Sequence, residues 1–186
     1  MPGGNASKET VLGFMTVVDG EHGVLGGYLL LNGTGRPLEF HCTMPLKPNR
    51  AQEILYGPTL KPYLYGDQIA PALVGKASSK VSVLLTDSPD VLAVRATLKI
   101  PVVVVAAADG DVAGPGAAGL RLWRVDAEHP GRTLKTFHIG NTAMAVAEEF
   151  AADATAATAA LQPLGTFDFH EPFGRIREAI DEAGRA

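Results

Sequence analysis

The chain has 186 residues, of which 46% are hydrophobic and 19% charged, and its formal net charge is −4. This composition predicts an ordinary globular fold, and mixed charges without a basic tail argue against nucleic acid as the main partner. The single cysteine excludes an internal disulfide. No stretch reaches the roughly 20 apolar residues that span a bilayer, so no membrane partner is expected.

The N-terminus has no apolar core of a secretion signal, which makes the cytoplasm the expected compartment. Residues 1–9 are small and polar and are predicted to be disordered, with a single α/β domain over 10–186. Three β-branched or apolar runs follow, at 10–18, 24–31 and 37–43. Glycine-containing turns separate the runs, which therefore predict an antiparallel meander.

A helix is expected at 49–57, because Asn49 can cap it and Gln52 stands at its third position. The stretch 58–77 is also helical in character. Glycine and proline interrupt it near Gly66 and Pro71, so short, kinked pieces are expected there.

Two compact apolar strands are predicted at 81–86 and 101–106. Between them, Ser88 can cap a helix that has Pro89 at its first position and runs to Lys99. A strand, helix and strand of this length predict two parallel strands joined by a right-handed crossover.

The segment 107–119 is a loop rich in glycine and alanine, and its sequence leaves open whether it is a lid or a spacer. A hairpin is predicted from 120–125 and 133–139. Small apolar residues at helical spacing then predict a helix over 142–161, and a final helix is expected at 172–184. The fold class is therefore α/β with a mixed sheet, combining the meander, a parallel β-α-β unit, a hairpin and two C-terminal helices.

One candidate site is a polar face on the third strand. Alternation places Glu39 and His41 on the same face, about 7 Å apart. Asp87 follows a predicted parallel strand, where ligands of open α/β sheets bind. These three residues are the candidate catalytic group of a metal-assisted hydrolase, with Asp109 or Arg50 in support. A solvent-facing strand and a helix-start carboxylate are the alternative readings, and no cofactor or metal site is predicted.

The second candidate is a binding surface in the window 28–67, which holds all four tyrosines. Tyrosine gives a large contact area at low entropy cost. Because no catalytic signature is found, the sequence leans away from an enzyme. It favours a non-enzymatic binding or assembly module that contacts a protein partner or a second copy of itself. The proposed contact residues are Arg50, Glu53, Tyr56, Tyr63 and Tyr65.

The segment 84–106, LLTDSPDVLAVRATLKIPVVVVA, resembles the strand, Pro-Cys-x-x-Cys, helix and strand of zinc-dependent nucleoside and nucleobase deaminases. Asp90 stands where that family has its first cysteine, and the helix at Asn49 lacks its His-x-Glu. The resemblance thus implies a deaminase-like architecture without the zinc ligands. A small-molecule sensor, with a pocket between the sheet and residues 58–77, is the further alternative.

Overall fold

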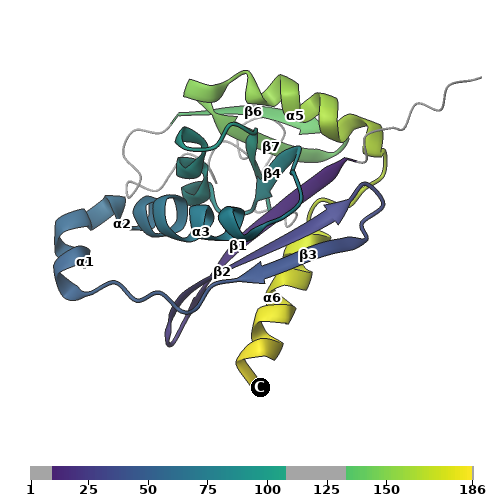
Figure 1. The fold of residues 1–186 in the computed structure, drawn as a ribbon. Coiled ribbons are helices and arrows are strands. Elements are labelled where there is room, and N and C mark those ends of the chain that lie inside the picture. Colours follow the sequence, from purple (N-terminus) through teal and green to yellow (C-terminus); the bar gives the residue numbers. More distant parts are fainter. Residues whose placement is uncertain (1–9, 108–132, 186) are drawn as a thin grey trace, which may run out of the picture.

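The computed structural model describes residues 10–107 and 133–185. Its strands form one seven-stranded mixed sheet in the order β3-β2-β1-β4-β5-β7-β6 (Figure 1). The strands are β1 (Val11–Gly20), β2 (Gly23–Asn32), β3 (Pro37–Cys42), β4 (Val83–Thr86), β5 (Val102–Val105), β6 (Leu134–Ile139) and β7 (Thr142–Ala147). The mixed α/β fold class predicted from the sequence is confirmed.

The first three strands pair antiparallel, as the glycine-rich turns predicted. β4 lies parallel to β1 on one side and to β5 on the other. The parallel pairing of the two apolar strands is therefore confirmed. Their connection is a 3-10 helix, η3 (Pro89–Ala96), which ends three residues before the predicted Lys99.

The helical part after the meander is broken, as predicted. α1 (Arg50–Tyr56) begins after Asn49, and the side chains of Asn49 and Gln52 form the expected reciprocal cap. The chain continues through a 3-10 turn, η1 (Gly57–Thr59), and α2 (Leu60–Pro62) into a π-helical segment, η2 (Tyr63–Ile69), and α3 (Ala70–Lys76).

The predicted helix at 142–161 is partly wrong. Residues Thr142–Ala147 form β7, which pairs with β5 and β6. A turn at Gly140, with φ of +57°, reverses the chain from β6 into this strand. Ala143, Ala145 and Ala147 favour a helix locally, but pairing between two strands outweighs that propensity. The helical part follows as η4 (Glu148–Phe150), α5 (Asp153–Leu161) and η5 (Gln162–Leu164). The other half of the predicted hairpin, 120–125, lies outside the described residues, as does the 107–119 loop beyond residue 107.

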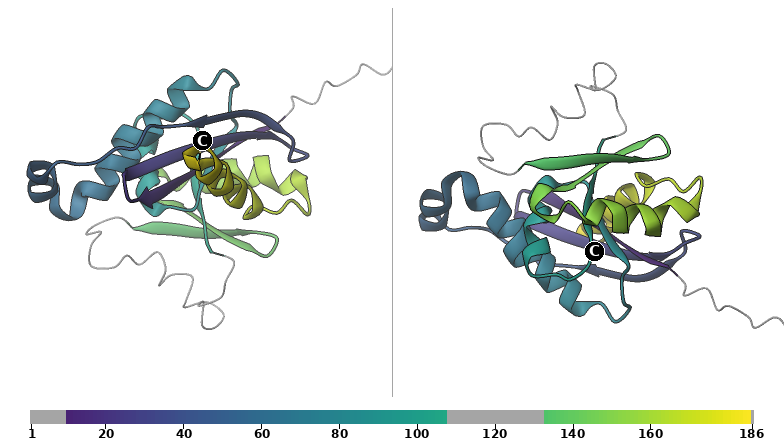
Figure 2. Two further views of the ribbon diagram at one scale, coloured as in Figure 1. Left: turned by 90° about the horizontal axis from the view of Figure 1, so that it is seen from below. Right: turned by 90° about the horizontal axis from the view of Figure 1, so that it is seen from above.

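Helices cover both faces of the sheet, with α3 and α6 (Glu171–Arg185) on opposite sides (Figure 2). Successive side chains of β1 point to opposite faces of the sheet and so belong to two separate apolar clusters. Leu12 and Phe14 belong to the apolar cluster under α5 and α6, and Met15 belongs to the cluster under the broken helices. Thr16 continues the Leu12 and Phe14 face and is fully buried.

Two adjacent glycines let the helices approach the sheet closely. A Cβ at Gly26 would lie 2.2 Å from Cγ2 of Ile69, and one at Gly27 would lie 2.3 Å from Cγ2 of Ile176. Both distances are too short for any side chain, so the Gly26-Gly27 pair sets how near η2 and α6 lie to β2. Among the described residues, no helix is long and apolar enough to cross a bilayer.

Candidate functional site at the ends of β1 and β4

A polar cluster lies where β4 ends beside β1. The register pairs Met15 with Thr86, so the next residues, Thr16 and Asp87, are neighbours on the face under α6. The Thr16 hydroxyl donates a hydrogen bond to Oδ1 of Asp87 at 2.7 Å. Arg177 of α6 donates from Nη2 to Oδ2 of Asp87, and also to the Thr16 hydroxyl oxygen at 3.2 Å.

This cluster lies where the connections of the sheet diverge. The chain leaves the carboxyl end of β1 toward β2 on one side, whereas it leaves the carboxyl end of β4 through η3 toward β5 on the other. In open α/β sheets, ligands bind beyond the carboxyl ends of strands whose connections diverge in this way. Asp87 stands at the strand end where the sequence placed it, and its ligand-binding role stays a prediction.

Solvent exposure increases across the cluster, from Thr16 through Asp87 to Arg177. Thr16 is fully buried, the Asp87 side chain is 21% exposed and the Arg177 side chain is 48% exposed. The Asp87 carboxylate is therefore bound on its buried side by the Thr16 hydroxyl and on its solvent side by the Arg177 guanidinium. A partly exposed carboxylate in a fixed orientation can accept a proton from water or bind a cationic or hydroxylic ligand.

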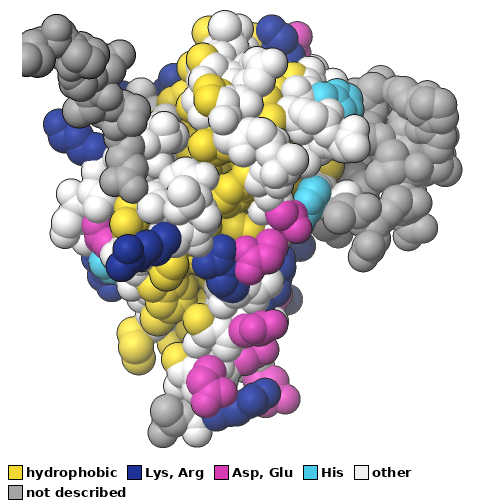
Figure 3. Space-filling model, turned by 90° about the vertical axis from the view of Figure 1, so that its right-hand side faces the viewer, with side chains coloured by type: hydrophobic (Ala, Val, Ile, Leu, Met, Phe, Trp, Pro, Cys, Tyr) yellow, Lys and Arg dark blue, Asp and Glu magenta, His cyan; other side chains and the backbone are white. Residues whose placement is uncertain are grey.

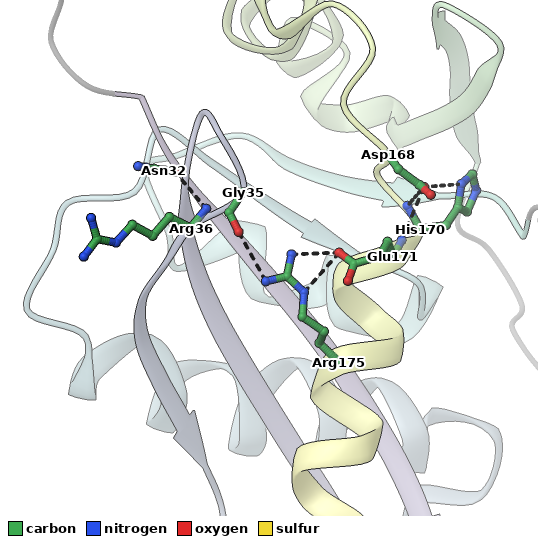
Figure 4. A network of polar contacts seen from close by, with 7 residues as sticks. All are labelled: Asn32, Gly35, Arg36, Asp168, His170, Glu171 and Arg175. Atoms are coloured by element: carbon green, nitrogen blue, oxygen red, sulfur yellow. Dashed lines mark hydrogen bonds and ion pairs between the residues drawn. The ribbon is translucent and has the colours of Figure 1, made fainter.

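The first turns of α6 are fastened to the body of the protein, which fixes the helix that carries Arg177 (Figure 4). Arg175 binds Oε2 of Glu171 through two nitrogens, at 2.7 and 3.0 Å, and donates to the carbonyl of Gly35 at 3.2 Å. The ring of His170 contacts the carbonyl of Ala106 through Nε2 at 2.7 Å. These contacts tie α6 to the β2–β3 turn and to the end of β5.

Glu39 and His41 are close to each other, with 2.9 Å between Oε2 and Nε2, but they form a different site. Glu39 also accepts hydrogen bonds from the hydroxyl and backbone N–H of Ser79 and from the N–H of Ser78. These bonds, the one from the Ser79 hydroxyl foremost, lower the pKa of Glu39 to about 2. The pair therefore fastens the loop after α3 to the edge strand β3.

The predicted catalytic group of Glu39, His41 and Asp87 is not assembled. β2 and β1 separate β3 from β4, which corresponds to about 14 Å across the strands. Glu39 and His41 also face the α3 side, since they pair with Leu30 and Tyr28 of that core cluster. Within residues 10–107 and 133–185, no three His, Cys, Asp or Glu side chains gather as metal ligands. Asp109 lies outside the described residues.

The tyrosine-rich window does not form one surface. Tyr28 is fully buried and Tyr65 is 9% exposed. Tyr56 and Tyr63 stack with ring centroids 4.1 Å apart, and the predicted pair of Arg50 and Glu53 forms at 3.1 Å on the exposed side of α1. The window therefore divides between core and surface, because β2 crosses the middle of the molecule while α1 stands outside it (Figure 1).

The space proposed for a sensor pocket is occupied by packed side chains. Leu64, Ile69 and Leu73 from the broken helices lie in one buried cluster with Tyr28 of the sheet. A groove of about 590 Å³ lies instead on the other side, between β3 and α6. Figure 3 shows hydrophobic side chains at the surface next to acidic ones on this side of the molecule. The groove is lined by Leu29, Pro37, Phe40, Arg175, Ile176, Glu178, Ala179 and Glu182.

Sequence reasoning missed Thr16 and Arg177. Thr16 is the polar residue on a face of β1 that otherwise carries Leu12 and Phe14, and this break in the apolar pattern is a usable signal. Arg177 directly follows Ile176 on α6 and gives no such signal, because its role depends on how the helix crosses the sheet.

No family model matches the chain, and no curated protein matches it. Its structure is similar to the crystal structure of human ENDOV, with a TM-score of 0.42 and 13% identity over 96% of this chain and 87% of that one. It is also similar to two structures of Ciona intestinalis endonuclease V in complex with DNA containing an inosine followed by a ribo-adenosine. Their TM-scores are 0.36 and 0.37 and their identities 13% and 14%, over 81% of this chain and 78% of theirs.

These similarities contradict part of the sequence-based prediction. The similar structures are nucleases, two of them bound to DNA, whereas the sequence favoured a non-enzymatic protein-binding module with no nucleic-acid partner. That prediction is wrong. Because all three TM-scores lie below 0.5, the likeness gives no argument about the reaction of this chain. Any conclusion about that reaction therefore depends on the geometry of Thr16, Asp87 and Arg177.

Proposed function

We propose that the chain is a hydrolase whose site lies at the carboxyl ends of β1 and β4. The observation that supports this best is the position of Asp87, a partly exposed carboxylate at the divergence of the strand connections. Side chains from two other elements, Thr16 and Arg177, orient it. A functional carboxylate needs this kind of support, because a loosely held side chain loses the proximity on which catalysis depends.

In this proposal Asp87 acts as general base. It takes a proton from a water molecule, and the water oxygen bonds to the electrophilic atom of the substrate. The bond to the leaving group then breaks with its electron pair, and the leaving group takes the proton from Asp87. Thr16 orients the carboxylate, and the positive charge of Arg177 stabilises negative charge that develops on the substrate.

The experiment is a hydrolysis screen of the purified full-length chain. The panel contains p-nitrophenyl acetate, p-nitrophenyl phosphate, bis-p-nitrophenyl phosphate, and single- and double-stranded DNA and RNA oligonucleotides, each with and without Mg²⁺. Nucleic acids are included because two of the similar structures contain DNA. We expect turnover of at least one class, and Asp87→Asn should reduce it about 100-fold or more.

Asp181→Asn is the matched control, because Asp181 is an exposed carboxylate on the same helix as Arg177. It should leave turnover unchanged. If the wild-type chain hydrolyses nothing in the panel, or if Asp87→Asn keeps full activity, the proposed function is wrong. Circular dichroism of each variant separates loss of activity from loss of fold.

The compartment and the domain division remain proposals as well. The cytoplasm is supported by Cys42, an exposed free thiol that a reducing compartment preserves. Cell fractionation with an epitope-tagged chain tests the compartment. Limited proteolysis with mass spectrometry of the fragments tests the division into residues 1–9 and a single domain over 10–186.

A further inference from the structure

The contacts of Arg177 differ from those of the other arginine near the start of α6. Arg175 makes three hydrogen bonds, two to Glu171 and one to the Gly35 carbonyl. Arg177 uses one nitrogen, Nη2, for both Thr16 and Asp87. In the described part of the chain, Nε and Nη1 of Arg177 have no hydrogen-bond acceptor. A guanidinium carries five N–H donors, so most of the donors of Arg177 have no acceptor among residues 10–107 and 133–185.

Arg177 also covers the oxygen that the proposed reaction needs. Oδ1 of Asp87 faces the buried Thr16 hydroxyl, so Oδ2 is the oxygen on the Arg177 side. Because Arg177 binds Oδ2, its guanidinium competes with a water molecule for this oxygen. The Arg177 side chain is 48% exposed, and its backbone lies on a helix fastened at both His170 and Arg175. The side chain can therefore turn outward without any movement of α6.

We propose that Arg177 is a latch that exchanges partners: it covers Asp87 in the free protein and turns to an oxyanion of the incoming ligand, which uncovers Asp87. The ligand class is a molecule with a phosphoryl or carboxylate group, because a guanidinium fork matches two oxygens of such a group. The consequence for catalysis rests on the hydrolase function proposed above, whereas the exchange of partners does not. Arg177 is then a ligand-binding side chain as well as a positioning residue for Asp87.

The first test measures the exchange itself in the full-length chain by NMR. The ¹⁵Nε–Hε resonance of Arg177 and the ¹³Cγ resonance of Asp87 are monitored during titration with sodium phosphate and, separately, with sodium acetate. Sodium chloride at equal ionic strength is the reference for screening. We expect both resonances to shift in a saturable way with one shared Kd. The stronger of the two anions identifies whether a phosphoryl or a carboxylate group is preferred.

Arg177→Met removes the guanidinium and keeps much of the aliphatic side chain. It should abolish the anion-dependent shift of the Asp87 ¹³Cγ resonance. Arg185→Met is the matched control, because Arg185 is an exposed arginine on the same helix with a loose contact of 3.7 Å to Glu182. It should leave the titration unchanged. The latch is wrong if chloride gives the same shifts, if Asp87 does not respond, or if it responds equally in Arg177→Met.

The second test uses turnover and separates a latch from a merely structural role. With an anionic substrate, Arg177→Met should raise KM about tenfold or more, because the oxyanion contact is lost. With the neutral substrate p-nitrophenyl acetate, the same variant should leave KM within about twofold of the wild-type value, because this substrate offers no anionic group for Arg177 to bind. An equal rise of KM for both substrates would overturn the latch while leaving the hydrolase intact. Absence of any hydrolysis would overturn the hydrolase, and the NMR titration would still decide the exchange.

Discussion

Ile176 of α6 packs directly against Gly27 of β2, where a Cβ would lie only 2.3 Å from Cγ2 of Ile176. The next residue along the helix, Arg177, reaches Thr16 and Asp87. Thr16 is in turn the register partner of Gly27 across β1 and β2. Because Gly27 has no side chain, α6 can lie close enough to β2 for Arg177 to contact Thr16 and Asp87.

Gly27→Ala tests this relationship. The added methyl group meets Ile176, and overpacking of this kind typically costs about 1–3 kcal/mol of the free energy of unfolding. We expect urea denaturation to show a loss in this range. Gly174→Ala is the control, because open space surrounds a Cβ at this helical glycine, and it should stabilise the protein by about 0.5–1 kcal/mol. Equal stability of wild type and Gly27→Ala would show that α6 can move away without cost.

Thr16→Val tests the support beneath Asp87. Valine has nearly the same shape, so the change removes the hydroxyl that donates to Asp87 and accepts from Arg177, and little else. We expect the free energy of unfolding to fall by about 1–2 kcal/mol, as for a partly buried hydrogen bond to a charged group. In Thr59→Val the lost bond is an exposed one to the Tyr56 carbonyl, and the change should stay within about 0.5 kcal/mol. Similar losses in the two variants would count against a special role for Thr16.

Glu39 predicts a specific pH dependence of stability. Its pKa is lowered from 4.5 to about 2 in the folded protein, first by the Ser79 hydroxyl and then by the Ser78 N–H and His41. Because the folded pKa lies below the unfolded one, the contribution of Glu39 is complete above about pH 4.5 and is lost as the pH falls toward 2.

Urea denaturation of wild type and Glu39→Gln between pH 7 and pH 2 measures this contribution. We expect the wild type to be the more stable at pH 7 and the difference to shrink between pH 4.5 and pH 2. A difference that stays constant over this window would mean that the carboxylate charge at Glu39 is not what holds Ser78 and Ser79.

The ion pair of Arg95 and Asp153 joins η3 to α5. Nε and Nη2 of Arg95 bind the two carboxylate oxygens at 2.7 and 3.1 Å, and its guanidinium lies 4.3 Å from the ring centroid of Phe150. The Asp153 side chain is 7% exposed. Removing one partner of a buried pair leaves the other charge uncompensated, so Asp153→Asn should cost about 3–5 kcal/mol.

The double variant Arg95→Met with Asp153→Leu is the counterpart to this prediction. It removes both charges, so it should be more stable than Asp153→Asn when both are measured by thermal denaturation. If the double variant is the less stable of the two, the pair contributes more than the cost of burying its charges.

Tyr28 carries a buried hydroxyl that has no hydrogen-bond partner among the described residues. An unpaired buried polar group costs about 1–3 kcal/mol. Tyr28→Phe should therefore raise the free energy of unfolding by about 1 kcal/mol, measured by urea denaturation, with Tyr63→Phe at the stacked surface pair as reference. Destabilisation by Tyr28→Phe would indicate that the hydroxyl has a partner after all.

Local signals in the sequence determined a large part of the fold. Glycine-containing turns delimited β1, β2 and β3, the Asn49 and Gln52 cap marked the start of α1, and continuous valines marked β5 as a buried strand. These signals act within a few residues, where backbone geometry and side-chain hydrogen bonding decide the outcome. They failed at Thr142–Ala147, because there the strand is stabilised by β5 and β6, which the local alanines do not reveal.

The site was decided by tertiary structure. The sequence alone placed Asp87 at a strand end, since a carboxylate after an apolar run is a local pattern. It could not separate Asp87 from Glu39 and His41, because the strand order that puts two strands between them depends on pairing across the whole chain. Nor could it bring Thr16, Asp87 and Arg177 together from positions up to 161 residues apart. The pairing of β1 with β4 and the packing of α6 on Gly27 do so, and contacts between distant segments of this kind give no local signal in the sequence.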